Sequence, residues 1–153
     1  MKTKISCYIR TKNEEDRIGE TVRAALFVAD EVVVIDSCSN DNTVIEAERA
    51  GATVFSKEWS GLGFQKRYGE EACQNNWVLD LDADEVISSN LANNINKIFS
   101  SRLSNENVFE IQLKTVDPSG KVWSHQSSGW RKKIYNKTCH RMPKSLEWDQ
   151  LQN

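Results

Sequence analysis

Two aspartates separated by one residue, Asp82 and Asp84, follow an apolar stretch that begins at Trp77. On an extended strand both side chains would point to the same face, because the side-chain period of a strand is two. Clustered carboxylates are costly to bury unless a cation or ligand compensates them. They are also the hard oxygen ligands that Mg²⁺ and Mn²⁺ prefer, often together with a diphosphate. The spacing therefore predicts a divalent-metal site at Asp82 and Asp84, although such a pair also occurs in solvated loops.

A third carboxylate, Asp36, directly follows the most strand-like run of the chain, Glu31 to Ile35. At the end of a buried strand it could accept a hydrogen bond from the imide N–H of a uracil or from a ribose hydroxyl. A turn or a helix cap would explain the same residue. We interpret Asp36 as a ligand-binding residue, and Asp41 and Thr43 as capping residues.

Three further polar residues could line the same crevice. Thr11 and Glu14 follow the first apolar stretch, where Asn13 is a plausible N-cap of the next helix. Lys66 lies near the start of the helix that precedes the acidic strand, within reach of a diphosphate. Helix capping explains Glu14 equally well, and a solvated helix face would explain Lys66.

Other readings of these patterns are weaker. A calcium-binding EF-hand loop starting at Asp80 would require glycine at position 85 and glutamate at position 91, where the chain has Glu85 and Leu91. The pair Gly61 and Gly63 lacks the third glycine of a dinucleotide-binding loop, which argues against NAD. A haloacid-dehalogenase-like phosphatase also carries two aspartates after an apolar strand, but on its first core strand. Here Asp82 and Asp84 follow the fourth predicted strand, so a phosphatase of this kind is a minor alternative.

The elements that must position these residues alternate between strands and helices. Strands are expected at residues 5–9, 31–35, 52–55 and from 77 onward, with helices at 14–27 and after residues 43, 63 and 88. This order is typical of right-handed βαβ units with a parallel sheet. Ligands bind such sheets at the carboxyl ends of the strands, where the predicted site residues lie.

The pattern changes after about residue 104. Apolar and polar residues alternate around Ile111, a turn is expected at residues 117–120, and antiparallel pieces are expected at 122–123 and 134–135. The sequence thus predicts an α/β fold with a nucleotide-binding half at residues 1–104. Residues 105–153 would be a short antiparallel extension of the same domain.

Length and composition fit one ordinary globular domain. The 153 residues carry a net charge of −2, which gives no electrostatic reason to expect nucleic-acid binding. The four cysteines are widely spaced, which favours reduced thiols in the cytoplasm over a zinc cluster. No apolar run approaches the ~20 residues needed to span a bilayer, and contact with a membrane surface stays open.

Taken together, the motifs resemble those of family 2 glycosyltransferases of the GT-A fold. The resemblance is strongest to the bacterial β-glycosyltransferases of the lipopolysaccharide core. It occurs in the family's order over roughly the first hundred residues, in the stretches Ile9 to Glu15, Val33 to Thr43, Trp59 to Lys66 and Trp77 to Val86.

The resemblance implies an inverting enzyme that uses a nucleoside-diphosphate sugar, most often a UDP-sugar, and Mg²⁺ or Mn²⁺. It also implies a glycan or lipid-linked acceptor of the cell envelope and a cytoplasmic location, including the inner face of the membrane. By the same resemblance, Asp84 would bind the metal and Asp82 the ribose or the metal. The roles implied for the rest are nucleobase binding for Asp36, nucleotide-pocket contacts for Thr11 and Glu14, and a phosphate or base contact for Lys66.

The catalytic base is not identified by these motifs. Asp117, Glu147 and Asp149 are all candidates, and residues 129–135 match the family's acceptor half only loosely. That half normally continues beyond the present sequence, so residues 105–153 are expected to be incomplete on the acceptor side. A truncated, non-catalytic domain that binds a sugar nucleotide or a partner chain is therefore the main alternative.

Overall fold

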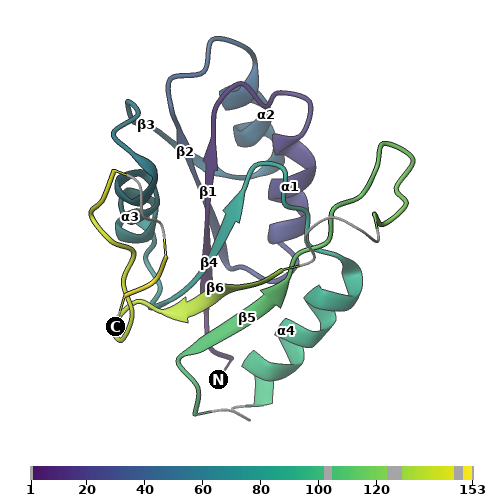
Figure 1. The fold of residues 1–153 in the computed structure, drawn as a ribbon, viewed down its shortest axis with the longest axis vertical. Helices are drawn as coiled ribbons and strands as arrows, with labels where there is room; N and C mark the ends of the chain where they lie inside the picture. Colours follow the sequence, from purple (N-terminus) through teal and green to yellow (C-terminus); the bar gives the residue numbers. More distant parts are fainter. Residues whose placement is uncertain (1, 102–104, 124–128, 147–149, 153) are drawn as a thin grey trace.

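A six-stranded sheet flanked by helices forms the centre of the molecule (Figure 1). The structure is a computed structural model that describes residues 2–101, 105–123, 129–146 and 150–152. The elements in chain order are β1 (Ile5–Thr11), α1 (Ile18–Ala25), β2 (Glu31–Asp36), α2 (Thr43–Ala50), β3 (Thr53–Ser56), α3 (Leu62–Ala72), β4 (Trp77–Asp82), α4 (Ser89–Ser101), β5 (Val108–Gln112) and β6 (Trp130–Asn136).

The strands lie in the order β3-β2-β1-β4-β6-β5. β1 pairs in parallel with β2 and β4, and β2 pairs in parallel with β3. The register places Thr11 opposite Asp36 and Arg10 opposite Asp82, so three strands end at one edge of the sheet. This edge is where the predicted site residues lie.

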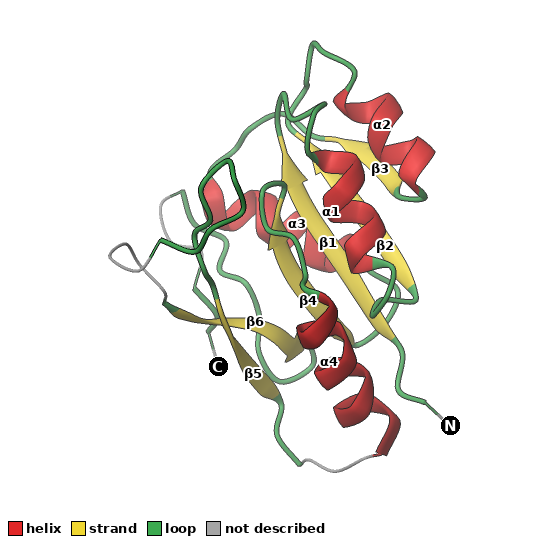
Figure 2. Cartoon of the chain, turned by 90° about the vertical axis from the view of Figure 1, so that its right-hand side faces the viewer, coloured by secondary structure: helices red, strands yellow, loops and turns green. Residues whose placement is uncertain are grey.

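Helices cover both faces of the parallel part of the sheet (Figures 1 and 2). Alternate residues of β1 point to opposite faces: Ile5, Cys7 and Ile9 pack with α1, α2 and α4, whereas Tyr8 packs on the side of α3. β1 and β2 are therefore buried almost throughout, which explains their continuous apolar sequences.

The last two strands, β5 and β6, are antiparallel, as expected, whereas the piece expected at 122–123 is reduced to an isolated bridge between Val122 and Val116. β6 pairs antiparallel with both β4 and β5, which makes this extension part of the same sheet. The predicted turn after Asp117 is present, with the Gly120 N–H donating to the Asp117 carbonyl over 2.9 Å. The predicted α/β fold, with a mostly parallel sheet and a short antiparallel end, is confirmed.

The first helix, α1, is shorter at both ends than the predicted 14–27. The helix expected from residue 14 begins only at Ile18, and Asn13 does not cap it. Asn13 has φ 52°, and its side-chain oxygen accepts the Asn40 N–H over 3.0 Å. Its side chain therefore links the β1–α1 loop to the β2–α2 loop instead of serving the helix.

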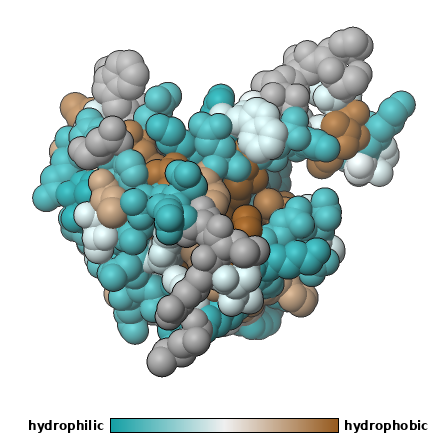
Figure 3. Space-filling view, turned by 90° about the horizontal axis from the view of Figure 1, so that it is seen from below, coloured by the Kyte–Doolittle hydropathy of each residue, from teal (hydrophilic) through white to brown (hydrophobic). Residues whose placement is uncertain are grey.

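The surface seen from below in Figure 3 is mostly hydrophilic, with apolar side chains gathered toward the middle of the view. Within the described ranges, no helix has both the length and the apolar character needed to cross a bilayer.

Candidate functional site

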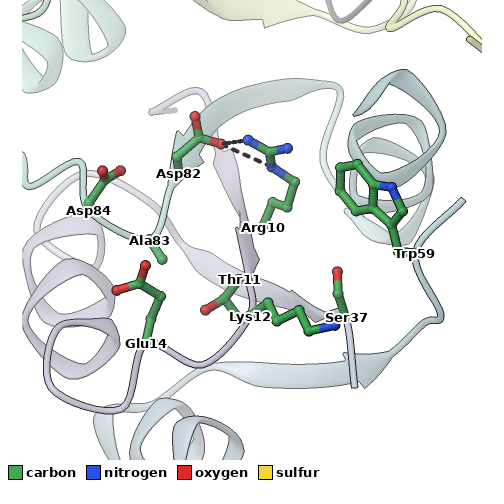
Figure 4. A pocket seen from close by; sticks show the side chains of 9 residues that line it. All are labelled: Arg10, Thr11, Lys12, Glu14, Ser37, Trp59, Asp82, Ala83 and Asp84. Carbon is green, nitrogen blue, oxygen red and sulfur yellow. Dashed lines mark hydrogen bonds and ion pairs between the residues drawn. The ribbon is translucent and has the colours of Figure 1, made fainter. Parts of the chain in front are cut away.

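A cavity of about 540 Å³ opens at the carboxyl ends of β1 and β4. Figure 4 shows its lining side chains, which come from the ends of β1 and β4, the loops after β1, β2 and β4, and the segment before α3. They are Arg10, Thr11, Lys12, Glu14, Ser37, Trp59, Asp82, Ala83 and Asp84.

Four of the six residues predicted from the sequence lie together in this cavity: Thr11, Glu14, Asp82 and Asp84. The other two, Asp36 and Lys66, are not part of its lining. Both are almost fully buried, with exposed fractions of 1% and 3%. They lie in the layer of residues that supports the cavity.

The acid pair is not arranged on an extended strand, as its spacing suggested. β4 ends at Asp82, and residues 83–84 form a turn. The turn is closed by Glu85, whose N–H donates to the Asp82 carbonyl over 3.0 Å and whose side chain accepts the Asp82 N–H over 2.9 Å. Lys133 of β6 holds the Glu85 carboxylate at 2.8 Å. Asp82 therefore stays in the wall of the cavity, while Asp84 lies on an exposed turn.

Arg10 is the immediate partner of Asp82. Its Nε and Nη2 lie 3.2 and 3.0 Å from Oδ1 of Asp82. Burial raises the pKa of the Asp82 carboxyl, but neighbouring positive charges, of which Lys66 and Arg10 act most strongly, outweigh burial and hold that pKa below its usual value. Asp82 is thus kept ionised, as a metal ligand must be.

Lys66 lies beneath the cavity in an ion pair with Asp80, with Nζ 2.9 Å from Oδ2. Lys133 lies 4.0 Å from the same oxygen. The positive charge of Lys66 acts on Asp82 from below. A direct contact between Lys66 and a phosphate or base stays a prediction.

Asp36 holds the loop that follows β2. Its carboxylate accepts the Ser39 N–H over 2.9 Å and the Ser39 hydroxyl over 2.5 Å. The Ser39 hydroxyl oxygen in turn accepts the Asn13 N–H over 2.8 Å. Ser37, which lines the cavity, is held separately: its N–H donates to the Thr11 carbonyl over 2.9 Å, and its hydroxyl oxygen accepts the Gln65 side-chain N–H over 2.9 Å. The nucleobase role of Asp36 also stays a prediction.

A second contact joins the same two loops. The Glu14 N–H donates to Oγ1 of Thr43 over 2.8 Å, and that hydroxyl donates to Asp41 over 2.5 Å. Asp41 also accepts the Thr43 N–H over 2.9 Å at the start of α2, in keeping with the capping role predicted for it. Thr43 does not cap the helix: it is the first residue of α2, after the N-cap Asn42, and its hydroxyl serves the loop contact instead. The loops after β1 and β2 therefore form one connected rim beside the cavity.

One buried polar atom at the cavity lacks a partner. Oγ1 of Thr11, a residue only 3% exposed, has no hydrogen-bond partner among the described residues. A buried hydroxyl without a partner is destabilising unless a ligand or water completes it. Because Thr11 lines the cavity, this hydroxyl is suited to contact a bound ligand.

The carboxylates at the cavity supply part of the ligand set that a hard divalent cation requires. In the described ranges, no group of three or more His, Cys, Asp or Glu side chains is arranged to hold a metal ion. Mg²⁺ characteristically binds one or two carboxylates and completes its shell with phosphate oxygens and water. Asp82 and Asp84 line the same cavity and suit such a shared site, in which a nucleotide would supply the remaining ligands.

Sequence reasoning missed four polar or aromatic lining residues, which are Arg10, Lys12, Ser37 and Trp59. A signal for Arg10 was available, because a charged residue directly after the apolar stretch ending at Ile9 must lie near the end of a buried strand.

Asp117 is the candidate base that falls within the described residues. It is not part of the lining of the cavity. The carboxylate of Asp117 accepts the Ser119 N–H over 2.8 Å and the Lys121 N–H over 3.0 Å within its own turn. The other two candidates, Glu147 and Asp149, lie outside the described residues.

Comparison with known proteins finds relatives of this chain among the glycosyltransferases. The family described as "Glycosyl transferase family 2" matches residues 6–147. An uncharacterized glycosyltransferase of Rickettsia bellii is 48% identical over 99 residues, which are 65% of this chain and 34% of the relative. The lipopolysaccharide core biosynthesis glycosyltransferase LpsC of Rhizobium meliloti is 30% identical over 95 residues, or 59% of this chain and 35% of LpsC.

A crystal structure of a mycobacterial protein has a TM-score of 0.56 and 25% sequence identity, covering 72% of this chain and 40% of that one. The matched part of the chain spans only about a third of the length of the two curated relatives.

Proposed function

The chain belongs to glycosyl transferase family 2, and from this premise we propose that its cavity binds a nucleoside-diphosphate sugar, with a UDP-sugar as the expected donor. The observation that carries the proposal is the meeting of Thr11, Glu14, Asp82 and Asp84 in one cavity at the carboxyl edge of the sheet. Ligands of open α/β sheets bind at this edge.

In this proposal Asp82 and Asp84 hold a divalent cation, Mg²⁺ or Mn²⁺. Such a cation neutralises the charge that develops on a departing nucleoside diphosphate. Thr11 and Glu14 contact the nucleoside, and the unpartnered hydroxyl of Thr11 supports this assignment. Asp36 contributes to nucleobase binding at the loop it holds, and Lys66 adds positive charge beneath the diphosphate.

We further propose that transfer inverts the anomeric centre. A carboxylate base would deprotonate the acceptor hydroxyl as it attacks from the face opposite the leaving diphosphate. The acceptor would be a glycan of the cell envelope or of the lipopolysaccharide core, for which the name of the relative LpsC is the support. Residues 1–104 would form the donor half and residues 105–153 the acceptor side.

Calorimetry of UDP binding with and without Mn²⁺ tests the donor site. We expect Mn²⁺ to strengthen UDP binding, and the Asp84→Asn variant to lose that gain. Glu48→Gln, which removes an exposed carboxylate from α2, is the matched control and should behave as the wild type. UDP binding that is equally strong with and without Mn²⁺, or unchanged in Asp84→Asn, would contradict the metal role.

A second candidate is a domain that binds the sugar nucleotide without transferring it. One observation favours it: among the described residues, none of the candidate bases lies at the cavity. Incubation with UDP-sugars and detection of released UDP separates the two, because the binding domain retains affinity but releases none. The phosphatase alternative loses its basis, since the chain matches a different family.

A further inference from the structure

Arg10 lies in the wall of the cavity between an acid and an aromatic ring (Figure 4). Two of its guanidinium nitrogens lie 3.2 and 3.0 Å from Oδ1 of Asp82. Its Cζ lies 5.7 Å from the centre of the Trp59 ring, in cation–π geometry. The side chains of Arg10 and Asp82 are 21% and 29% exposed, so this ion pair faces the cavity rather than the core.

The pair is of a kind that exchanges partners easily. Both nitrogens of Arg10 converge on a single oxygen of Asp82, instead of forming the parallel two-oxygen fork of the strongest arginine–carboxylate pairs. Partly exposed ion pairs contribute little to stability because water competes for both groups. The guanidinium can rotate toward another partner while it stays in contact with the Trp59 ring.

Charge balance around the end of β4 makes Arg10 different from its neighbours. The ion pairs there join Lys66 to Asp80, Lys133 to Asp80 and Glu85, and Arg10 to Asp82. The lysine side chains are 4% and 6% exposed, so they are enclosed in their pairs. Arg10 is the cation of this group that faces the cavity. A divalent cation on Asp82 would repel it from the same oxygen.

Building on the proposed donor site, we propose that Arg10 is an exchangeable counter-ion. It holds Asp82 while no divalent cation is bound, and it turns to the diphosphate of the donor when a cation occupies the Asp82 carboxylate. Its planar fork of donors suits phosphate oxygens. Arg10 therefore opposes cation binding to the empty protein and favours diphosphate binding once the cation is present.

These opposite effects define the test. The Arg10→Met variant keeps an unbranched side chain against Trp59 and removes the charge. We expect Mn²⁺ alone, followed by the electron paramagnetic resonance signal of the free ion, to bind several-fold more tightly to Arg10→Met than to the wild type. At saturating Mn²⁺, UDP should bind at least about tenfold more weakly by calorimetry, as for loss of a hydrogen bond to a charged group.

Two further variants control the comparison. Arg49→Met removes the same charge from an exposed pair with Glu46 on α2 and should change neither affinity. Arg10→Lys keeps the charge but not the fork, so Mn²⁺ should bind as in the wild type and UDP more weakly. If Arg10→Met does not fold, Arg10→Lys decides: weaker UDP binding at unchanged Mn²⁺ affinity supports the exchange, and unchanged UDP binding overturns it.

Mn²⁺ and UDP affinities that fall together in Arg10→Met, or that both stay unchanged, would overturn the exchange and leave the donor site standing. Wild-type protein that binds no UDP in the presence of Mn²⁺ would overturn the donor site itself.

Discussion

Lys66 and Asp80 form an ion pair in which Nζ lies 2.9 Å from Oδ2, with side chains only 4% and 3% exposed. The pair joins α3 to β4 directly below the cavity. A buried charge is tolerated when it is paired, and removing one partner leaves the other uncompensated. The contact therefore supports the wall that carries Asp82, whether or not Lys66 also meets a ligand.

We expect Lys66→Met to lower the free energy of unfolding by up to about 3 kcal/mol, because the buried Asp80 carboxylate would lose its closest cation and keep Lys133, at 4.0 Å, as a more distant partner. Urea unfolding followed by circular dichroism measures this. Lys97→Met, which removes an exposed lysine of α4, should change stability by no more than about 0.5 kcal/mol. A loss below about 1 kcal/mol in Lys66→Met, combined with abolished UDP binding, would instead identify Lys66 as a direct ligand contact.

Thr11→Val should separate stability from binding. Valine keeps the shape of threonine and removes a buried hydroxyl that has no partner within the described part of the chain. We expect stability to stay level or to rise by up to about 1 kcal/mol, while UDP binds several-fold more weakly. Thermal melting and calorimetry on the same samples measure both. A clear loss of stability would mean that the hydroxyl is already satisfied in the free protein.

The parallel sheet could be predicted because short stretches of sequence indicate its strands and helices one by one. The β-branched residues of β2 predict a buried strand, and the spacing of apolar residues in α1 predicts a helix, each within a few residues. Alternating strands and helices imply a parallel sheet, in which the strands end at the same edge. Thr11 and Asp82 are therefore expected to lie close together.

What could not be predicted depends on partners distant in sequence. The turn after Asp82 relies on Glu85 and its contact with Lys133, 48 residues away. Arg10 meets Asp82 only because β1 and β4 are neighbours in the sheet. The side chain of Asn13 can either cap a helix or join two loops. The sequence does not distinguish these roles, and in the structure Asn13 joins the loops.

The four cysteines should fall into two classes. Cys38 and Cys139 are exposed, whereas Cys7 and Cys73 are buried, and none is in a disulfide. Burial raises the pKa of the Cys73 thiol to about 12. At about pH 8, we expect two thiols to react quickly with a colorimetric disulfide reagent and two only after denaturation. More than two fast thiols in folded protein would contradict the packing around β1.

The same raised pKa predicts a loss of stability in alkali. An unfolded thiol ionises at about pH 8.5. The neutral Cys73 thiol therefore stabilises the fold fully below that pH, and this contribution is lost as the pH rises toward the pKa of the thiol in the folded protein. We expect the melting temperature to fall between about pH 8 and about pH 10. A Cys73→Ala variant should be less stable at neutral pH because of the cavity, but its melting temperature should depend less on pH in this range. An equal alkaline decline in both proteins would show that other groups cause it.

Two helix glycines should respond oppositely to alanine. A Cβ on Gly69 of α3 would lie 2.8 Å from the ring of Tyr8, which is fully buried and bonded through its hydroxyl to Tyr135 at 3.0 Å. This ring cannot yield, so Gly69→Ala should cost about 1 to 3 kcal/mol despite the better helix propensity of alanine.

On Gly19 of α1, the added Cβ would approach only the end of the Arg23 side chain, at 3.1 Å. That side chain is flexible and exposed, so Gly19→Ala should stabilise the protein by about 0.5 to 1 kcal/mol. Urea unfolding of both variants measures the difference in sign. The contrast matters because helix propensity alone predicts the same gain at both positions. Equal gains would mean that α3 does not approach β1 as closely as the Tyr8 contact requires, and that the buried layer below the cavity is looser than its ion pairs indicate.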